Sequence, residues 1–248
     1  MTPRLDLSAG MLAALAVPAR AAPRPWQLGL SDAASPVAAE ICDLHRLILY
    51  VSAAVFAFLL AVLVLVLCRF NRRSHPVAVQ REHSPMLQAA AVGVPAIVLV
   101  VVAIPALKLV YAAAAPGPAD VTVAAVARGG YWTYAYPKDG NFAFDSHKDA
   151  GMTADRPLVV PAGRPVEVLL GAKDAIQTWS IPELGVGAMA VPGRTIRIRF
   201  TAAKPGLYTG LGAFRGAVVP VAVRAVAEEQ YESWRFLAQA RFAPADTP

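Results

Sequence analysis

Side chains that could bind a metal or act as nucleophiles are few in this chain of 248 residues. The two cysteines are Cys42 and Cys68, and three of the four histidines precede residue 117. From residue 117 onward the sequence contains one histidine, His147, and no cysteine. A dinuclear copper centre requires bridging thiolates together with imidazoles. The C-terminal half therefore lacks the side chains for such a centre.

The individual candidates are better explained as structural or surface residues. His147 stands among Asp145, Ser146 and Lys148, which predicts a solvated histidine in a polar turn. His45 and Cys42 lie just before an apolar segment, where a polar cap and a structural thiol are expected. Cys68 lies at the far end of that segment, so a disulfide with Cys42 is not expected.

Two apolar segments in the first half predict membrane-spanning helices. Leu47–Cys68 contains no charged residue and is long enough to cross the hydrocarbon core as a helix. The second segment runs from about Met86 to Leu107, and its prolines, Pro95 and Pro105, are tolerated in a membrane helix. The composition, 56% apolar and 16% charged, agrees with a few membrane spans.

The charge distribution predicts how these helices are oriented. Arg4, the apolar stretch Leu7–Val17 and Ala19-Arg20-Ala21 have the form of a secretory signal peptide with its cleavage site. The basic loop Arg69–Arg81 between the apolar segments is expected in the cytoplasm. The C-terminal half is then outside the cytoplasm of a bacterial-type membrane. The basic residues do not form a stripe with interleaved aromatics, so nucleic-acid binding is excluded.

The C-terminal half consists of short β-rich stretches separated by glycine and proline turns. The predicted strands are Val121–Ala127, Tyr131–Tyr136, Leu158–Val160, Val166–Leu170, Thr195–Thr201 and Val218–Ala225. Many short strands with regular turn signals predict an all-β sandwich or barrel. Tyr231, Trp234 and Leu237, spaced three apart, predict a terminal helix over 228–240.

These observations divide the chain into four predicted regions. Residues 1–21 form a signal peptide and residues 22–46 an extracytoplasmic segment. Residues 47–115 form a transmembrane helical hairpin, and residues 116–248 form the extracytoplasmic β domain with its terminal helix.

Local sequences along almost the whole mature chain resemble subunit II of the haem-copper respiratory oxidases. In chain order they are Ala34-Ser35-Pro36, Arg69-Phe70-Asn71, Ile104–Leu109, Tyr131–Pro137, Asp174–Pro182, Pro192-Gly193-Arg194 and Pro205–Tyr208. The resemblance implies two transmembrane helices followed by a cupredoxin-like Greek-key sandwich. In copper-bearing members this domain passes electrons from cytochrome c to the haem-bearing subunit.

The resemblance also identifies family residues that are replaced in this chain. The positions of the copper ligands fall at Gln177, Leu211, Ala213, Arg215 and Val219, and the ligand loop is three residues short before Pro220. The tryptophan that receives electrons falls at Gly130, and the glutamate at the mouth of a proton pathway falls at Gln88. No metal, cofactor or catalytic residue is therefore expected in this chain. Haem and copper are expected in the partner catalytic subunit.

Three other residues match family positions that face or brace the catalytic subunit: Asp174, Trp179 and Arg194. An interface role and a plain role in the fold are equally compatible with these matches. Trp132 and the neighbouring tyrosines Tyr131, Tyr134 and Tyr136 are instead expected to pack in the core rather than to carry electrons.

The leading hypothesis is subunit II of a quinol-oxidising terminal oxidase, a non-catalytic subunit that binds subunit I, membrane lipid and, by the same resemblance, subunit III. Residues 117–248 contain fourteen Lys and Arg against twelve Asp and Glu, so they present no net acidic field to a basic cytochrome c. Three alternatives remain open. They are a degenerate cytochrome c oxidase subunit with another electron route, a nitric oxide reductase-like subunit, and a membrane-anchored assembly or interaction module.

Overall fold

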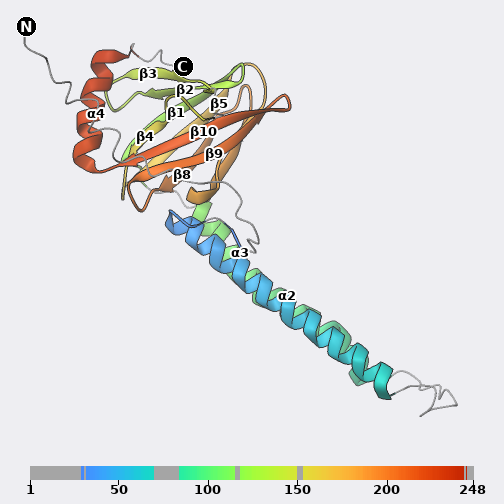
Figure 1. The fold of residues 1–248 in the computed structure, drawn as a ribbon. Coiled ribbons are helices and arrows are strands. Elements are labelled where there is room, and N and C mark those ends of the chain that lie inside the picture. The colour runs from blue at the N-terminus through green and yellow to red at the C-terminus, as the bar shows by residue number, and fades with distance from the viewer. Residues whose placement is uncertain are drawn as a thin grey trace, which may run out of the picture. The chain divides into compact units, whose positions relative to one another are not determined.

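The computed structural model describes residues 29–30, 32–69, 84–114, 118–149, 153–242 and 244. The predicted signal peptide and nearly all of the predicted cytoplasmic loop lie outside these residues. Backbone contacts divide the chain into two compact units. One is Glu40–Ala115, and the other joins Pro116–Pro248 to the residues up to Ala39. Figure 1 shows the long helices of the first unit and the β domain of the second.

The first unit is built from two long apolar helices, α2 (Pro36–Arg69) and α3 (Pro85–Ala114). Both have the length and hydropathy of membrane spans, and α3 continues through Pro95 and Pro105 as predicted. Helix α2 begins eleven residues before the apolar segment Leu47–Cys68, because polar residues also adopt helical structure once the first turn is capped.

The cap of α2 belongs to the β-domain unit. Ser35 accepts a hydrogen bond from the Ala38 amide at 3.0 Å through its hydroxyl, and the same hydroxyl donates to the Leu184 carbonyl at 2.7 Å. Gly185 has a φ of +68°, and a Cβ there would lie 3.0 Å from the Ala38 backbone. The start of α2 is therefore fixed against the domain by one buried serine and one glycine.

The β domain contains ten strands in the described part of the chain. They are β1 (Val121–Arg128), β2 (Tyr131–Tyr136), β3 (Phe142–Ser146), β4 (Leu158–Pro161), β5 (Pro165–Ala172), β6 (Gln177–Ile181), β7 (Val186–Ala190), β8 (Ile196–Thr201), β9 (Gly206–Phe214) and β10 (Ala217–Val226). Hydrogen bonding orders them as β3-β2-β1-β5-β8, β4-β10-β9 and β6-β7. A single cluster of buried side chains draws on all three sheets, as in a sandwich. The predicted fold class, two membrane helices followed by an all-β sandwich, is confirmed.

Each of the six predicted strands is present within about two residues of its expected limits, whereas four further strands were not predicted. In β2 the alternation is regular, and Trp132, Tyr134 and Tyr136 are fully buried, as expected for core residues. The unpredicted strands are β3, β6, β7 and β9. Strand β9 carries Gly206, Gly210 and Gly212, and glycine weakens the sequence signal for a strand.

The predicted terminal helix is α4 (Glu228–Arg241). Its buried residues are Tyr231 and Ala238, and Trp234 packs partly buried beside them. Leu237 was expected on this face but is 66% exposed. The spacing of three residues drifts around a helix of 3.6 residues per turn, so the third member of the stripe points away.

Candidate functional site

Four loops lie at one end of the β domain, and the residues at the predicted copper-ligand and interface positions lie in these loops or in the strands that they connect. We call this region the turn end. It comprises residues 129–130 between β1 and β2, 173–176 between β5 and β6, 191–195 between β7 and β8, and 215–216 between β9 and β10.

Hydrogen bonds join three of these loops to one another or to a strand end. The Gly129 amide donates a hydrogen bond to the Asp174 carboxylate at 2.9 Å. Ala172 and Pro192 form a parallel β-bridge, which places the 191–195 turn beside the end of β5. The 129–130 and 173–176 loops are thus held together, and the 191–195 turn is held beside the end of β5.

Strands β9 and β10 form a regular antiparallel hairpin in the segment where the resemblance predicts a metal-binding loop. Phe214 pairs with Ala217, and Gly212 pairs with Val219, without interruption. The turn has two residues, Arg215 and Gly216, with φ values of 48° and 82°. Two consecutive positive φ values are typical of the type I′ turn, the tightest common hairpin connection.

The five predicted ligand positions face different environments. Leu211 is 61% exposed and Ala213 is also exposed, whereas Gln177 and Val219 are buried at 0% and 4%. Side chains alternate along a strand. The glycines at positions 210 and 212 face β6, so the side chains at 211 and 213 point away from it. The two groups of positions therefore do not converge on a common point.

Close packing of backbones explains the glycines of β9. A Cβ at Gly210 would lie 1.8 Å from the Ser180 carbonyl oxygen, and one at Gly212 would lie 2.1 Å from the Thr178 carbonyl oxygen. These distances exclude any side chain. Strand β9 is thus held against β6 by direct backbone contact.

Gln177 is a buried polar residue with an unusual environment. Its side chain is inaccessible to solvent, and neither its amide oxygen nor its amide nitrogen has a hydrogen-bond partner among the described residues. A buried polar group without a partner costs about 1–3 kcal/mol. One amide does not make a metal site. Within the described residues, no group of three or more His, Cys, Asp or Glu side chains could hold a metal ion.

Gly130, at the predicted electron-entry position, is part of the β1–β2 turn. Its φ is +93°, and a Cβ there would lie 3.3 Å from the Phe214 ring. A large side chain would be strained by that φ and would need the phenylalanine to move. The guanidinium of Arg215 lies 5.4 Å from the centre of the same ring. The tip of the β9–β10 hairpin therefore covers this position.

The three predicted interface residues divide into buried and exposed side chains. Trp179 is completely buried, packs against Phe200, and donates a hydrogen bond from its indole to the Tyr134 hydroxyl at 3.3 Å. Burial raises the pKa of Tyr134 well above its usual value. The Trp179 side chain is a core residue, which favours a role in the fold, or in bracing the turn end from beneath, over direct contact with a partner subunit.

Asp174 and Arg194 are exposed at the turn end. Asp174 accepts the hydrogen bond from Gly129, so it has a role in the fold as well as a surface position. The Arg194 amide donates to the Val191 carbonyl at 3.2 Å and closes the Pro192-Gly193 turn. The Arg194 side chain forms no ion pair with a described residue of this chain, which leaves its charge available to a partner.

The remaining candidates are His147, Gln88 and the two cysteines. His147 is exposed and its ring lies 4.4 Å from that of Tyr131. Gln88 is an exposed residue near the start of α3. Cys42 and Cys68 lie near opposite ends of α2, about 39 Å apart along a helix that rises 1.5 Å per residue, so they cannot be bonded to each other.

Comparison with known proteins decides the family. The transmembrane-domain model of cytochrome c oxidase subunit II matches residues 23–109, and its periplasmic-domain model matches residues 121–226. A probable cytochrome c oxidase subunit 2 of Rickettsia bellii is 31% identical over 86% of this chain and 84% of that protein. This chain belongs to the cytochrome c oxidase subunit II family.

Other members of the subunit II family show similar identity. Cytochrome c oxidase subunit 2 of Arabidopsis thaliana is 30% identical over 86% of this chain and 90% of that protein. Among solved structures, the periplasmic domain of subunit II of cytochrome oxidase from Bradyrhizobium japonicum is 33% identical over 51% of this chain and 99% of that chain, with a TM-score of 0.49.

Membership of the subunit II family places this chain in the membrane with two transmembrane helices and a periplasmic C-terminal domain. It is a subunit of a haem-copper oxidase complex, an oxidoreductase with other subunits. The family also implies a copper centre in this domain. Whether this chain can hold one depends on the donor atoms at the predicted ligand positions. Leucine, alanine and valine offer none, arginine repels a cation, and one glutamine amide replaces an imidazole. These residues do not fit a dinuclear copper centre.

Two features of the site were not anticipated from the sequence. The first is the phenylalanine ring over Gly130, because Phe214 and Gly130 lie far apart in the chain. The second is the backbone contact of β9 with β6. The spacing Gly-x-Gly at 210–212 is a signal for close backbone approach that could have predicted it.

Proposed function

We propose that this subunit II lacks the dinuclear copper electron-entry site and serves a quinol-oxidising terminal oxidase as a structural, partner-binding subunit. One observation carries the proposal. At the positions predicted for the copper ligands the chain has Gln177, Leu211, Ala213, Arg215 and Val219, and the predicted ligand loop is a hairpin closed by two residues. Electrons then reach the catalytic subunit without passing through this chain, and quinol reduces that subunit directly.

The charge of the periplasmic domain supports this proposal. Cytochrome c is strongly basic and docks on acidic surfaces. Residues 117–248 have fourteen basic and twelve acidic residues, and the exposed turn end carries Lys173, Arg194 and Arg215 beside Asp174. A basic protein is repelled, not attracted, at this end.

The partner of the subunit is the haem-bearing subunit I, which holds the haem and copper of the complex, together with subunit III. Arg194 and Asp174 are the proposed contact residues. The arginine has a fixed backbone turn beneath it and no ion pair with a described residue, so its planar guanidinium is suited to bind a carboxylate or a haem propionate in a bidentate manner.

The electron donor is tested with the complete complex purified from its native membrane. Oxygen uptake is measured with a quinol and with reduced cytochrome c, and copper is counted against haem. The expected result is uptake with quinol alone, and copper that is accounted for by subunit I. A mixed-valence dinuclear copper spectrum arising from this chain would contradict the proposal.

A second candidate is a cytochrome c oxidase in which electrons take another route. The two relatives named above are called cytochrome c oxidase subunits, which favours this candidate. In that case the same preparation consumes oxygen with reduced cytochrome c although this chain holds no copper. The donor assay therefore separates the two candidates.

The interface residues are tested by co-purification. Truncating one partner of a buried charge pair costs about 2–5 kcal/mol. We expect Arg194→Ala to lower recovery of the haem-bearing subunit with this chain, and Lys148→Ala, another exposed cation, to leave it unchanged. Equal recovery with both variants would remove Arg194 from the interface. Failure of the wild-type chain to retain any haem protein would favour an anchored interaction module.

A further inference from the structure

Helix α4 follows the segment that the periplasmic-domain model of the family matches. The family match ends at residue 226, and α4 begins at Glu228. Its inner face is well packed, because Tyr231 and Ala238 are buried and the Trp234 ring lies 5.4 Å from that of Tyr136. The helix is therefore a fixed element of the domain.

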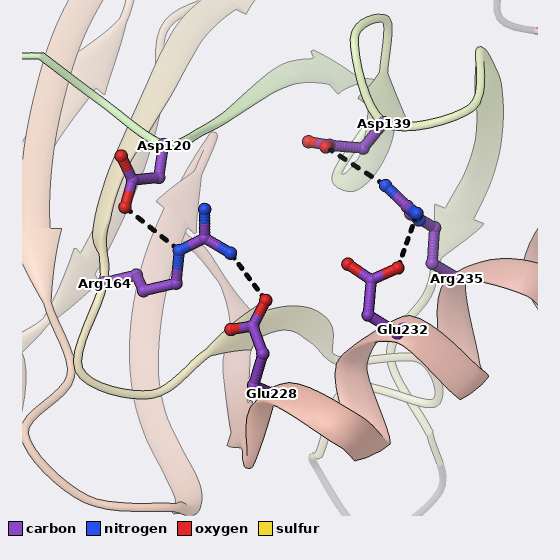
Figure 2. Close-up of polar contacts among 6 residues, drawn as sticks. All are labelled: Asp120, Asp139, Arg164, Glu228, Glu232 and Arg235. Carbon is purple, nitrogen blue, oxygen red and sulfur yellow. Dashed lines mark hydrogen bonds and ion pairs between the residues drawn. The ribbon is translucent and has the colours of Figure 1, made fainter.

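Two arginines hold α4 against the strands (Figure 2). Arg164, in the turn between β4 and β5, contacts Glu228 at 2.6 Å and Asp120 at 3.0 Å. Arg235, on the helix, contacts Glu232 at 2.5 Å and lies 3.9 Å from Asp139. Exposed ion pairs contribute little stability individually. Together they fix the rotation of α4 about its axis, so its outward face is set before any partner binds.

The outward side of α4 carries two large apolar side chains that are next to each other and exposed. Phe236 and Leu237 are 74% and 66% exposed, and the small residues Ser233 and Ala240 are exposed beside them. These four positions follow the spacing i, i+3, i+4 and i+7, which lines one side of a helix. The opposite side is already buried on the domain. An exposed ridge of this kind on a rigid helix is typical of a protein contact.

The charges of α4 indicate what the partner is. Glu228, Glu232 and Arg235 are used within the domain. Two charged residues remain: Glu229 in the first turn and Arg241 in the last, neither ion-paired with a described residue. The apolar ridge thus has a negative charge at one end and a positive charge at the other. Such a surface is complementary to a copy of itself in the opposite direction.

We propose that α4 packs antiparallel against α4 of a second copy of this chain, around a two-fold axis. Phe236 and Leu237 form the centre of the contact, and Glu229 of each copy faces Arg241 of the other. An isologous contact of this kind closes as a dimer. The ridge is smaller than the roughly 800 Å² per partner of a standard interface. Association is therefore weak in dilute detergent and depends on the high effective concentration of anchored copies in a membrane.

The helix dipole offers a competing explanation for the two charges. A glutamate in the first turn and an arginine in the last turn each favour the helix on their own. The two explanations differ in the double reversal Glu229→Arg with Arg241→Glu. Both dipole contacts become unfavourable in that variant, whereas the contacts between copies are restored.

The test is cross-linking of the full-length chain in its native membrane. Ser233→Cys is treated with a short bis-maleimide, and the cross-linked dimer is measured on denaturing gels. Lys148→Cys, an exposed residue outside α4, measures random collision. We expect Ser233→Cys to give clearly more cross-linked dimer than Lys148→Cys.

The charge reversals are made in the Ser233→Cys background. Glu229→Arg or Arg241→Glu should lower the yield of cross-linked dimer roughly tenfold, and the double reversal should restore it. Phe236→Ser should also lower it.

Several outcomes would overturn the proposal. They are a Ser233→Cys yield no higher than that of Lys148→Cys, single reversals without effect, and a double reversal that falls below the single ones. A cross-link from Ser233→Cys to a different protein would assign the ridge to another partner. Trp fluorescence of each variant in the membrane checks that α4 remains docked, since Trp234 of α4 packs against Tyr136 of the domain.

Discussion

The turn end of the periplasmic domain and the side covered by α4 use their polar residues differently. At the turn end Gln177 is buried without a hydrogen-bond partner among the described residues, and Arg194 projects outward without an ion pair to any of them. On the α4 side Arg164 contacts two carboxylates and Arg235 lies between two more (Figure 2). The turn end thus has polar groups that find no partner among the described residues. The α4 side pairs most of its charged groups within the domain, although the Tyr231 hydroxyl and one Asp139 carboxylate oxygen are buried there without a hydrogen-bond partner among those residues.

This difference indicates what holds each region together. The α4 side combines aromatic packing with ion pairs. The turn end depends on apolar burial and on backbone contact, as in the approach of Gly210 to the Ser180 carbonyl oxygen. Neither kind of contact requires a metal. The domain is therefore expected to fold without copper, and the stability of its turn end should respond to side-chain volume rather than to ligands.

The largest effect is expected from Trp179, the core residue next to the turn end. Truncation of a buried tryptophan to alanine costs about 3–5 kcal/mol, through lost burial and the cavity that remains. We expect Trp179→Ala to lower the free energy of unfolding by this amount. The measurement is denaturant unfolding of the detergent-solubilised chain. Trp179→Phe, which keeps most of the volume, should cost less. Unchanged stability combined with lost assembly would favour the interface hypothesis for this residue.

A second large effect is expected from a single added methyl group in β9. Gly210→Ala places a Cβ 1.8 Å from the Ser180 carbonyl oxygen, so β9 and β6 must separate. Overpacking costs about 1–3 kcal/mol, and the upper end applies because backbone cannot rotate away. Gly171→Ala in β5 is the matched control, since no atom lies within 4 Å of its Cβ position. Equal stability of the two variants would refute the close backbone contact.

Regular patterns in the sequence were sufficient to predict the membrane helices and the core of the sandwich. The charge-free run Leu47–Cys68 and the alternation in Tyr131–Tyr136 each have one clear physical interpretation. The start of α2 was not predictable in this way. It depends on Ser35, which caps the helix and also bonds Leu184, a residue 149 positions away in sequence.

The sequence was sufficient to predict which residue types occupy the candidate site, but not in which direction their side chains point. The sequence shows that the predicted ligand positions lack thiolates and imidazoles. It does not show that Leu211 faces outward and Gln177 inward, because β9 and β6 were not predicted as strands. Glycine-rich segments have no alternating pattern from which a face can be assigned. Trp179 was ambiguous for the related reason that burial depends on which strands pack around it.

A smaller, pH-dependent effect is expected on the α4 side. Burial raises the pKa of Asp139 above its usual range, although the Arg235 guanidinium opposes this shift. Arg164 and Lys138 act in the same direction as Arg235, and Glu232 adds to the burial effect. The folded domain therefore binds a proton at Asp139 more tightly than the unfolded chain does.

The sign of the dependence follows from linkage. A carboxyl with a raised pKa in the folded state stabilises the fold at low pH and loses this contribution as the pH rises through the raised value. We expect the stability of the wild type, relative to Asp139→Asn, to fall as pH increases from the ordinary carboxyl pKa upward. Denaturant unfolding of both proteins across this range is the measurement. The opposite slope would mean that the ion pair with Arg235 outweighs burial.

The smallest effect is expected from grafting copper ligands onto the turn end. The triple variant Gln177→His, Leu211→Cys and Arg215→Cys supplies one imidazole and two thiols. The imidazole replaces a buried side chain, whereas position 211 is on the outward face of β9 and position 215 is in the tight turn. Metal sites require ligands placed to within tenths of an ångström. The variant should therefore retain no stoichiometric copper after dialysis and give no mixed-valence spectrum.

The positive control is a variant with a loop three residues longer that includes the second histidine. The longer loop removes the regular β9–β10 pairing, which holds position 211 on the outward face, away from the buried position 177. Tight copper binding by the triple variant alone would show that the β9–β10 hairpin opens readily. The turn end would then differ from the α4 side only in its side chains and not in its backbone.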